Sequence, residues 1–145
     1  MTQSSAPEVE SPPAPPRLTV RDVMRPAVTT AEQDGHLAAA AYLMKHAGAT
    51  ALVIVDDHGS SRPIGIITEA DVVHAVADGM DMNEVRVRDV MTARLTAINA
   101  TTSIRDAAES MLAGHFRHLP IVDDAGLVGI ADITDVCRAL LAMSG

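Results

Sequence analysis

An internal repeat limits the possible folds of this chain more than any other feature of its sequence. The block Val20-Arg21-Asp22-Val23-Met24 recurs 67 residues later as Val87-Arg88-Asp89-Val90-Met91. Further pairs at the same spacing are Met44 with Met111, Val55 with Val122, and Asp56 with Asp123. The spacing then falls to 64 residues, because one turn of the first copy is three residues longer, and Gly65 matches Gly129. Motifs that recur in the same order indicate a duplicated structural unit.

Each copy has the pattern of a β-α-β-β-α unit. The first copy predicts an extended segment at 27–30, a helix at 35–46, strands at 52–55 and 64–67, and a closing helix at 69–77. The second copy predicts the same elements at 95–98, 103–113, 119–122, 127–131 and 133–143, with Ser103 as a helix N-cap. An Asp-Asp pair with a nearby glycine predicts a hairpin turn between the two strands. The strands are continuously apolar, which is typical of a sheet that is covered on both faces.

The repeat also predicts the domain organisation. Residues 1–17 are rich in Pro, Ser and Glu and have no hydrophobic period, which predicts a disordered leader. The copies, called repeat 1 and repeat 2 below, are expected at 18–80 and 85–145, joined by a linker around Gly79. A unit of roughly 60 residues is marginal by itself, because too much of its surface stays exposed to water. We therefore expect the two repeats to pack on each other.

The composition excludes several classes of function. The formal net charge is −8, whereas a nucleic-acid binder needs a basic face. No apolar run is long enough to cross a membrane, so we expect a cytoplasmic protein without a membrane span. Hydrophobic residues make up 48% of the chain but aromatic residues only 1%, which predicts a core of Ala, Val, Ile, Leu and Met. The single cysteine, Cys137, cannot form an intramolecular disulfide and is expected to be a small buried apolar residue.

Three motifs make the chain resemble the CBS domain family. They are the Asp-Val-Met blocks, the strand Arg117-His118-Leu119-Pro120-Ile121-Val122-Asp123, and a motif Gly-φ-x-(Ser/Thr)-x-x-Asp, with φ apolar, that leads into the last helix. The resemblance covers about Leu18 to Met143. It implies an α+β fold in which two β-α-β-β-α repeats pack sheet to sheet about a pseudo-twofold axis, a Bateman module. It also implies a stand-alone regulatory protein, a homodimer, and two clefts that can hold AMP, ADP, ATP or S-adenosylmethionine.

In repeat 1 the third motif reads Gly65-Ile66-Ile67-Thr68-Glu69-Ala70-Asp71. Thr68 falls where a strand meets a helix, so free backbone N–H groups at the helix N-terminus can bind a phosphate. Asp71 can accept hydrogen bonds from the two hydroxyls of a ribose, as acidic residues do in dinucleotide-binding folds. The same Thr-x-x-Asp spacing also predicts a capping box, in which both side chains serve only the helix. The sequence leaves both interpretations open.

Repeat 2 departs from this motif. It has Asp132 where repeat 1 has Thr68, followed by Thr134 and Asp135. An Asp at this position can still cap the helix. However, it removes a hydroxyl donor and adds a carboxylate where a phosphate would approach, which is unfavourable.

A basic pair in repeat 2 can compensate for the extra acid. The resemblance implies that basic side chains at the positions of Arg117 and His118 face the phosphates of the ligand. Repeat 1 has Thr50 and Ala51 at the matching positions. The two clefts are therefore expected to be chemically unequal. Arg117 has an alternative role as the partner of Asp123 or Asp124 in an ion pair.

Other candidate residues are those that follow the Asp-Val-Met blocks, and two histidines near the start of the second strand of repeat 2. Arg25, Thr92 and Arg94 are expected to line the cleft of the opposite repeat. His115 and His118 do not predict a metal site, because on a strand their spacing turns the two rings to opposite faces and no third ligand is evident.

Two functions are consistent with these observations. The first is a regulatory module that senses an adenine nucleotide in the cleft between the repeats, with no obligatory cofactor. Its candidate ligand-binding residues are Thr50, Thr68, Asp71, Thr92, Arg117, His118, Asp132, Thr134 and Asp135. The alternative is a protein-interaction module with an empty cleft, which acts through dimerisation and recruitment of an unidentified protein partner. No nucleophile elbow is present, so no enzymatic activity is predicted.

Overall fold

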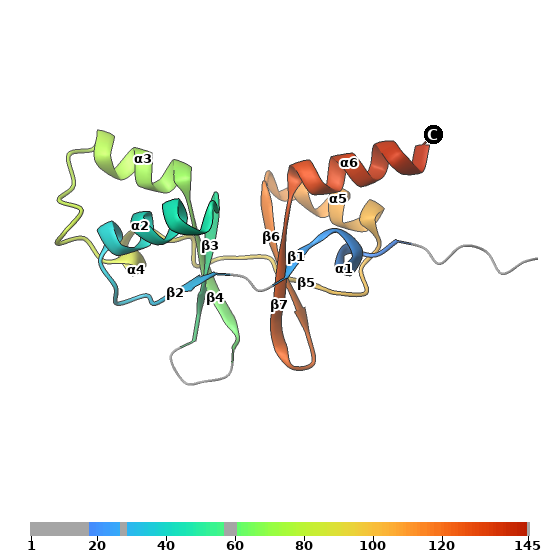
Figure 1. Ribbon diagram of the computed structural model, residues 1–145, viewed down its shortest axis with the longest axis horizontal. Coiled ribbons are helices and arrows are strands. Elements are labelled where there is room, and N and C mark those ends of the chain that lie inside the picture. The colour runs from blue at the N-terminus through green and yellow to red at the C-terminus, as the bar shows by residue number, and fades with distance from the viewer. Residues whose placement is uncertain (1–17, 27–28, 57–60, 145) are drawn as a thin grey trace, which may run out of the picture.

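The computed structural model describes residues 18–26, 29–56 and 61–144, and shows two lobes side by side (Figure 1). The first lobe contains β2 (Thr30–Ala31), α2 (Leu37–Ala47), β3 (Ala51–Val55), β4 (Pro63–Thr68), α3 (Glu69–Ala77) and α4 (Val87–Val90). The second lobe contains α1 (Val20–Val23), β1 (Arg25–Pro26), β5 (Ile98–Asn99), α5 (Ile104–Gly114), β6 (His118–Asp123), β7 (Gly126–Asp132) and α6 (Ile133–Ser144). The predicted leader, residues 27–28 of the extended segment, and residues 57–60 of the first hairpin turn lie outside the described residues.

Each lobe is built on one sheet. The first sheet has the strand order β2-β3-β4, and the second has the order β1-β7-β6-β5. In both sheets the first strand of the unit is parallel to the next, and the hairpin strands are antiparallel. The sheets face each other across the centre of the molecule, and the long helices cover their outer faces (Figure 1). The predicted α+β fold of two β-α-β-β-α repeats packed sheet to sheet is confirmed.

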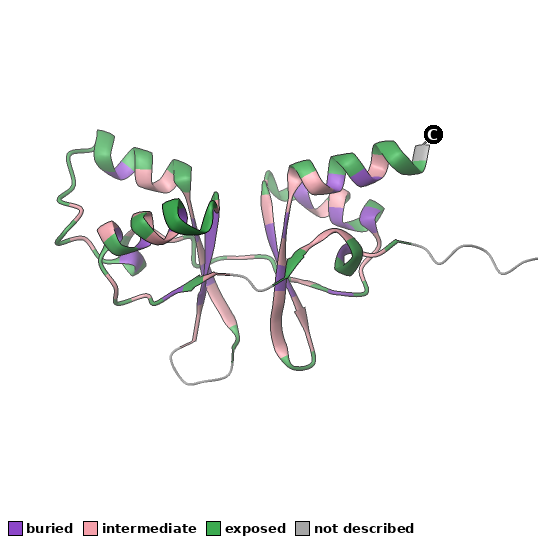
Figure 2. Cartoon of the chain, in the orientation of Figure 1, coloured by how far each residue is buried: buried purple, intermediate pink, exposed green. Residues whose placement is uncertain are grey.

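The core of each lobe is aliphatic, as the composition predicts. Four consecutive residues of β3, Ala51 to Ile54, are buried, which confirms that this strand is covered on both faces. In α5 the buried side chains are Ile104, Ala107 and Met111, and the Ser103 hydroxyl caps the helix by accepting a hydrogen bond from the backbone N–H of Asp106 (3.0 Å). Figure 2 shows the buried residues concentrated on the strands and on the helix faces turned toward them.

The prediction that Cys137 is buried is wrong. Cys137 is exposed on α6. The face of α6 that packs on the core carries Val136 and Ala139, together with the half-buried Ile133 and Leu140. Cys137 lies one position beyond Val136, which is about 100° around the helix and outside this apolar stripe. None of the helices among the described residues is both long enough and apolar enough to cross a membrane.

The first segments of the two repeats are exchanged between the lobes. Val20 of α1 belongs to the core of the second lobe, and its backbone N–H donates to the carbonyl of Thr102 (2.9 Å). Val87 of α4 belongs to the core of the first lobe, and its N–H donates to the carbonyl of Gly35 (2.8 Å). Each Asp-Val-Met block therefore packs on the lobe formed by the rest of the other repeat.

This exchange explains why the methionine and the glycine recur together. A Cβ added to Gly129 would lie 2.4 Å from the Sδ of Met24, and one added to Gly65 would lie 2.8 Å from the Sδ of Met91. Each methionine thus occupies the space that a side chain on the glycine would fill. The contact joins the first segment of one repeat to the second hairpin strand of the other.

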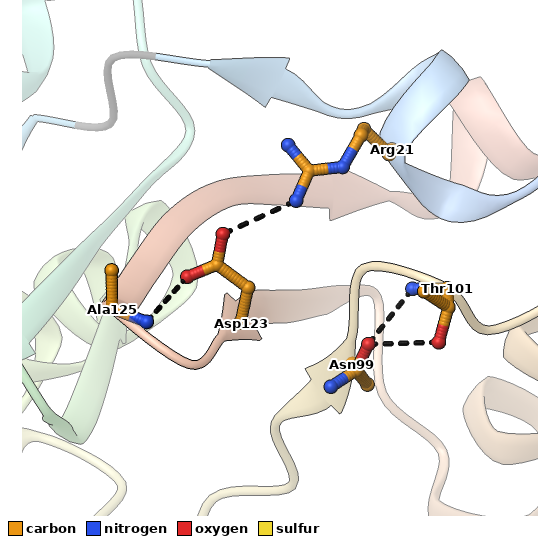
Figure 3. A network of polar contacts seen from close by, with 5 residues as sticks. All are labelled: Arg21, Asn99, Thr101, Asp123 and Ala125. Carbon is orange, nitrogen blue, oxygen red and sulfur yellow. Dashed lines mark hydrogen bonds and ion pairs between the residues drawn. The ribbon is translucent and has the colours of Figure 1, made fainter.

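A polar network fixes the N-terminal segment on the second lobe (Figure 3). The guanidinium of Arg21 lies 3.2 Å from the carboxylate of Asp123, at the end of β6. The other carboxylate oxygen of Asp123 accepts a hydrogen bond from the N–H of Ala125 (2.8 Å) and so holds the β6–β7 turn. Both carboxylate oxygens of Asp123 therefore already interact with residues of its own lobe.

Candidate functional site

A cavity of about 420 Å³ lies where the two lobes meet and where α3 and α6 begin. Its volume falls within the range of small-molecule sites, which is about 300–1,000 Å³. Each of these helices contributes its cap residue and its first two residues to the lining. The residue before β3, the residue before β6 and the first residue of β6 complete it. The lining residues are Thr50, Thr68, Glu69, Ala70, Arg117, His118, Asp132, Ile133 and Thr134.

The N-terminus of α3 has the capping box that the spacing predicts. The backbone N–H of Thr68 donates to Asp71 Oδ2 (2.8 Å), and the N–H of Asp71 donates to the Thr68 hydroxyl (3.3 Å). The carbonyl of Thr50 accepts from the N–H of Glu69 (3.0 Å). The capping interpretation is therefore confirmed. The carboxylate of Asp71 accepts through Oδ2, and its Oδ1 makes no hydrogen bond with the described residues.

The N-terminus of α6 is capped differently. Asp132 Oδ1 accepts a hydrogen bond from the N–H of Asp135 (2.8 Å), so the cap survives the change from Thr to Asp. The Asp135 carboxylate does not reach back to Asp132. It lies 3.7 Å from Nε of Arg25 and 3.7 Å from Nη1 of Arg138. A second nitrogen of Arg25 lies 3.8 Å from Asp132 Oδ2.

One hydrogen bond connects the lobes across the cavity. The Thr50 hydroxyl and His118 Nε2 are 2.9 Å apart. Burial lowers the pKa of His118 below its ordinary value of 6.5, because the charged ring would lose hydration. The nearby Asp132 carboxylate opposes this effect, and Arg117 adds to it. His118 is therefore a neutral imidazole at neutral pH.

Arg117 is the cation of the cavity that has no protein partner among the described residues. Its side chain makes neither a hydrogen bond nor an ion pair with them, and its carbonyl accepts from the N–H of Ile133 (2.8 Å). The alternative ion pair of Arg117 with Asp123 or Asp124 is not formed among the described residues, because Arg117 precedes β6 whereas Asp123 ends it. The guanidinium of Arg117 is thus available to an anion.

A narrower apolar slot of about 120 Å³ adjoins the cavity at Thr68 and His118. Its walls are largely apolar side chains, among them Ile66, Leu95, Phe116 and Pro120. Thr92 and Arg94 also line it, and the backbone of Thr92 pairs with that of Ile66 in the first lobe (2.9 and 3.0 Å). Phe116 was not predicted as a site residue, although it is the only phenylalanine in the chain.

The structure brings together most of the predicted site residues. Six line the cavity, namely Thr50, Thr68, Arg117, His118, Asp132 and Thr134. Thr92 lines the slot, and Asp71 and Asp135 follow Thr68 and Asp132 by three residues in the first turns of α3 and α6 and are not among the lining residues. Arg25, Thr92 and Arg94 lie against the opposite repeat, as expected. Glu69, a carboxylate on the cavity wall, was missed.

The described residues contain no group of three or more His, Cys, Asp or Glu side chains placed to hold a metal ion. The prediction that His115 and His118 lie on one strand, with their rings on opposite faces, is wrong, because His115 is not on a strand. It ends α5 in the left-handed conformation (φ 56°), and only His118 belongs to β6.

Two β-α-β-β-α repeats with the N-termini of their closing helices at one central cavity define a class of paired domains. The model of the CBS domain family matches residues 20–78 and 87–142, and the chain therefore belongs to this family. It is 40% identical over 120 residues to a 17.7 kDa protein of Acidianus ambivalens, a match that covers 82% of this chain and 66% of that protein. The chain spans 42% to 66% of the length of the first three curated relatives that it matches.

Two solved structures support the same assignment. A CBS-domain containing protein from Agrobacterium tumefaciens has a TM-score of 0.76 and 30% identity, and the match covers 85% of this chain and 99% of that chain. The protein CBSX2, solved in complex with AMP, has a TM-score of 0.69 and 26% identity, with coverage of 88% and 98%.

Proposed function

We propose that this chain is a cytoplasmic regulatory module that senses an adenine nucleotide in the cavity between its lobes. The observation that carries the proposal is the convergence on one cavity of about 420 Å³ of two helix N-termini and of Arg117, which has no partner within the described part of the chain. The positive end of a helix dipole and a guanidinium both stabilise a phosphate. The AMP complex of the related CBSX2 supports an adenine nucleotide as the ligand class.

The apolar slot beside the cavity suits the adenine ring. Ile66, Leu95 and Pro120 offer apolar surface to a flat ring, and Phe116 offers an aromatic one. Thr68 lies on both the slot and the cavity, so a nucleotide whose base fills the slot has its ribose close to Thr68. Asp71 Oδ1 is then the acceptor for the ribose hydroxyls, while Oδ2 keeps the capping box.

The charges of the cavity favour a ligand with few phosphates. Arg117 is positive, but Glu69 and Asp132 place two carboxylates on the same wall. Asp132 is partly neutralised by Arg25 at 3.8 Å. A triphosphate would bring more negative charge against Glu69 than a monophosphate does. We therefore expect AMP, or S-adenosylmethionine, which has no phosphate and a net positive charge, to bind more tightly than ATP.

Calorimetry tests the proposal directly. Protein shown by mass spectrometry to be free of small molecules is titrated with AMP, ADP, ATP and S-adenosylmethionine. The expected result is saturable binding, tightest for AMP or S-adenosylmethionine. A Kd of about 10 μM would raise the free energy of unfolding by about 2.7 kcal/mol at about 1 mM ligand. The absence of binding by all four ligands would contradict the proposal.

Exposed apolar side chains favour a second property, self-association. Val73 and Val76 on α3 and Leu141 and Met143 on α6 are 53% to 75% exposed. Apolar side chains clustered on helix surfaces are typical of protein interfaces. We propose that these helices form the contact in a homodimer, and that a protein-interaction role would use the same surface. Sedimentation showing only monomers at micromolar concentration would contradict the dimer.

A further inference from the structure

The two repeats give three matched positions that together form two half-sites. The first half-site has Thr68, Asp71 and Thr92, and the second has their counterparts Asp132, Asp135 and Arg25. The aspartate is shared, whereas the other two positions differ together. Where Thr68 becomes an acid in the second half-site, Thr92 becomes a base. The extra negative charge of the second half-site is thus accompanied by an extra positive charge.

The contacts of Arg25 show that this pair of changes is coupled in space. Its guanidinium lies between the two carboxylates of the second half-site, 3.8 Å from Asp132 and 3.7 Å from Asp135. Arg138 contacts Asp135 from the other side at 3.7 Å. The two carboxylates and the two guanidinium groups balance in charge. Asp71, by contrast, forms no ion pair with the described residues and is used in the capping box.

The backbone holds Arg25 in this place. In β1, Arg25 is paired with Ile130 and Pro26 with Gly129 of β7. The preceding Met24 packs against Gly129, where no larger residue would fit. Arg25 therefore enters the second half-site from an edge strand that is held by its pairing with β7 and by the contact of Met24 with Gly129.

The space beside Arg25 is smaller than the matching space of the first half-site. The cavity that Arg25 lines with Asp132, Ile130 and Ala51 has a volume of about 40 Å³. The matching region of the first half-site, beside Thr92 and Thr68, is the slot of about 120 Å³ that adjoins the central cavity. The central cavity of about 420 Å³ borders both half-sites, through Thr68 and through Asp132, but among the described residues the larger adjoining slot lies at the first half-site.

We infer that Arg25 occupies the second half-site in place of a ligand and closes it, so that each chain binds one nucleotide, at the first half-site. Arg25 is then the residue that determines which half-site is used. The inference rests on the proposed function, because it states which half-site a nucleotide can enter.

An exchange of residues between the half-sites tests the inference. The double variant R25T/D132T gives the second half-site the residues of the first, and T68D/T92R does the reverse. Calorimetry with AMP is expected to give one site per chain for the natural protein, two for R25T/D132T and none for T68D/T92R. R21T, which removes an arginine from the same segment but from the Asp123 ion pair, is the control and keeps one site.

Each outcome separates the inference from the proposed function. Two sites in the natural protein, or one site in R25T/D132T, would overturn the role of Arg25 and leave nucleotide binding intact. An absence of AMP binding in all variants would overturn the proposed function, and the closed half-site with it.

Thermal unfolding tests the coupling between Arg25 and Asp132 without any ligand. R25T alone should lower the Tm, and D132T added to it should recover part of the loss, whereas strictly additive effects would overturn the coupling.

Discussion

Thr50 and His118 form the hydrogen bond that joins the two lobes across the central cavity, with 2.9 Å between the hydroxyl and Nε2. Thr50 immediately precedes β3 and His118 opens β6, so the bond links equivalent edges of the two sheets. Both residues line the cavity. The protonation state of the His118 imidazole therefore affects both the hydrogen bond between the lobes and the charge of the central cavity.

The stability of the protein should depend on pH through His118. Burial lowers the pKa of His118 in the folded state below 6.5, its ordinary value in an unfolded chain. Between the two pKa values the unfolded chain binds more protons, so the free energy of unfolding falls as the pH falls through this window. Thermal unfolding measured between about pH 7.5 and about pH 5.5 should show a lower Tm at the acidic end.

The variant H118Q isolates this effect. Glutamine keeps a polar group beside Thr50 but does not titrate, so the loss of stability from neutral to acidic pH should be smaller than in the natural protein. H74Q is the control, because His74 is exposed on α3 and does not line the cavity. An equal pH dependence in H118Q and the natural protein would show that His118 is not the responsible group.

Substitution of Gly129 should destabilise the junction between the repeats. In G129A the new Cβ would lie 2.4 Å from Met24 Sδ and 3.0 Å from the carbonyl oxygen of Arg25, so β1 must shift away from β7. Overpacking of this kind costs about 1–3 kcal/mol. Chemical denaturation of G129A and the natural protein measures the difference in the free energy of unfolding.

The double variant M24A/G129A shows whether the methionine is the cause. Alanine at position 24 removes the side chain that the new Cβ meets, so the two substitutions together should cost less than the sum of their separate costs. Additive costs would mean that Met24 and Gly129 do not interact energetically, in conflict with the packing in the structure.

The carboxylate of Glu69 should disfavour ligands with several phosphates. In E69Q the wall of the cavity loses one negative charge, and we expect the affinity for ATP to rise by about threefold or more, with a smaller gain for AMP. Calorimetry with both nucleotides measures the ratio. E109Q, on the exposed face of α5 and outside the cavity, serves as the control. An unchanged ATP-to-AMP ratio in E69Q would argue against a phosphate position near Glu69.

The secondary structure and the fold could be predicted because the relevant signals are local and occur twice. The hydrophobic runs at β3 and β6, the Ser103 cap and the Thr68–Asp71 box depend on residues a few positions apart. The closing helix α3 was predicted at its observed bounds, and the other long elements within about two residues. The matching copies also indicated that two sheets of the same kind would pack together.

The exchange of α1 and α4 between the lobes could not be derived from the blocks themselves, although Arg25, Thr92 and Arg94, which follow them, were expected at the opposite repeat. The Val-Arg-Asp-Val-Met blocks are identical, so their sequences do not indicate which lobe each one contacts. That choice depends on distant contacts such as Val20 with Thr102. The position of Arg25 between Asp132 and Asp135 follows from the same exchange. For Cys137, the sequence did not show which face of α6 would be buried. A shift of one residue along a helix moves a side chain about 100° around it, from the buried stripe to the surface.

The central claim, a nucleotide held at the first half-site, is tested most directly by comparing D71N with D22N. Both aspartates accept the N–H of a threonine three residues earlier at 2.8 Å, Asp71 from Thr68 and Asp22 from Thr19. Each variant should therefore lose a similar stability, about 0.5–1 kcal/mol. In a calorimetric titration with AMP, we predict that D22N binds like the natural protein and that D71N shows no binding. Equal AMP binding by D71N and the natural protein would contradict the account.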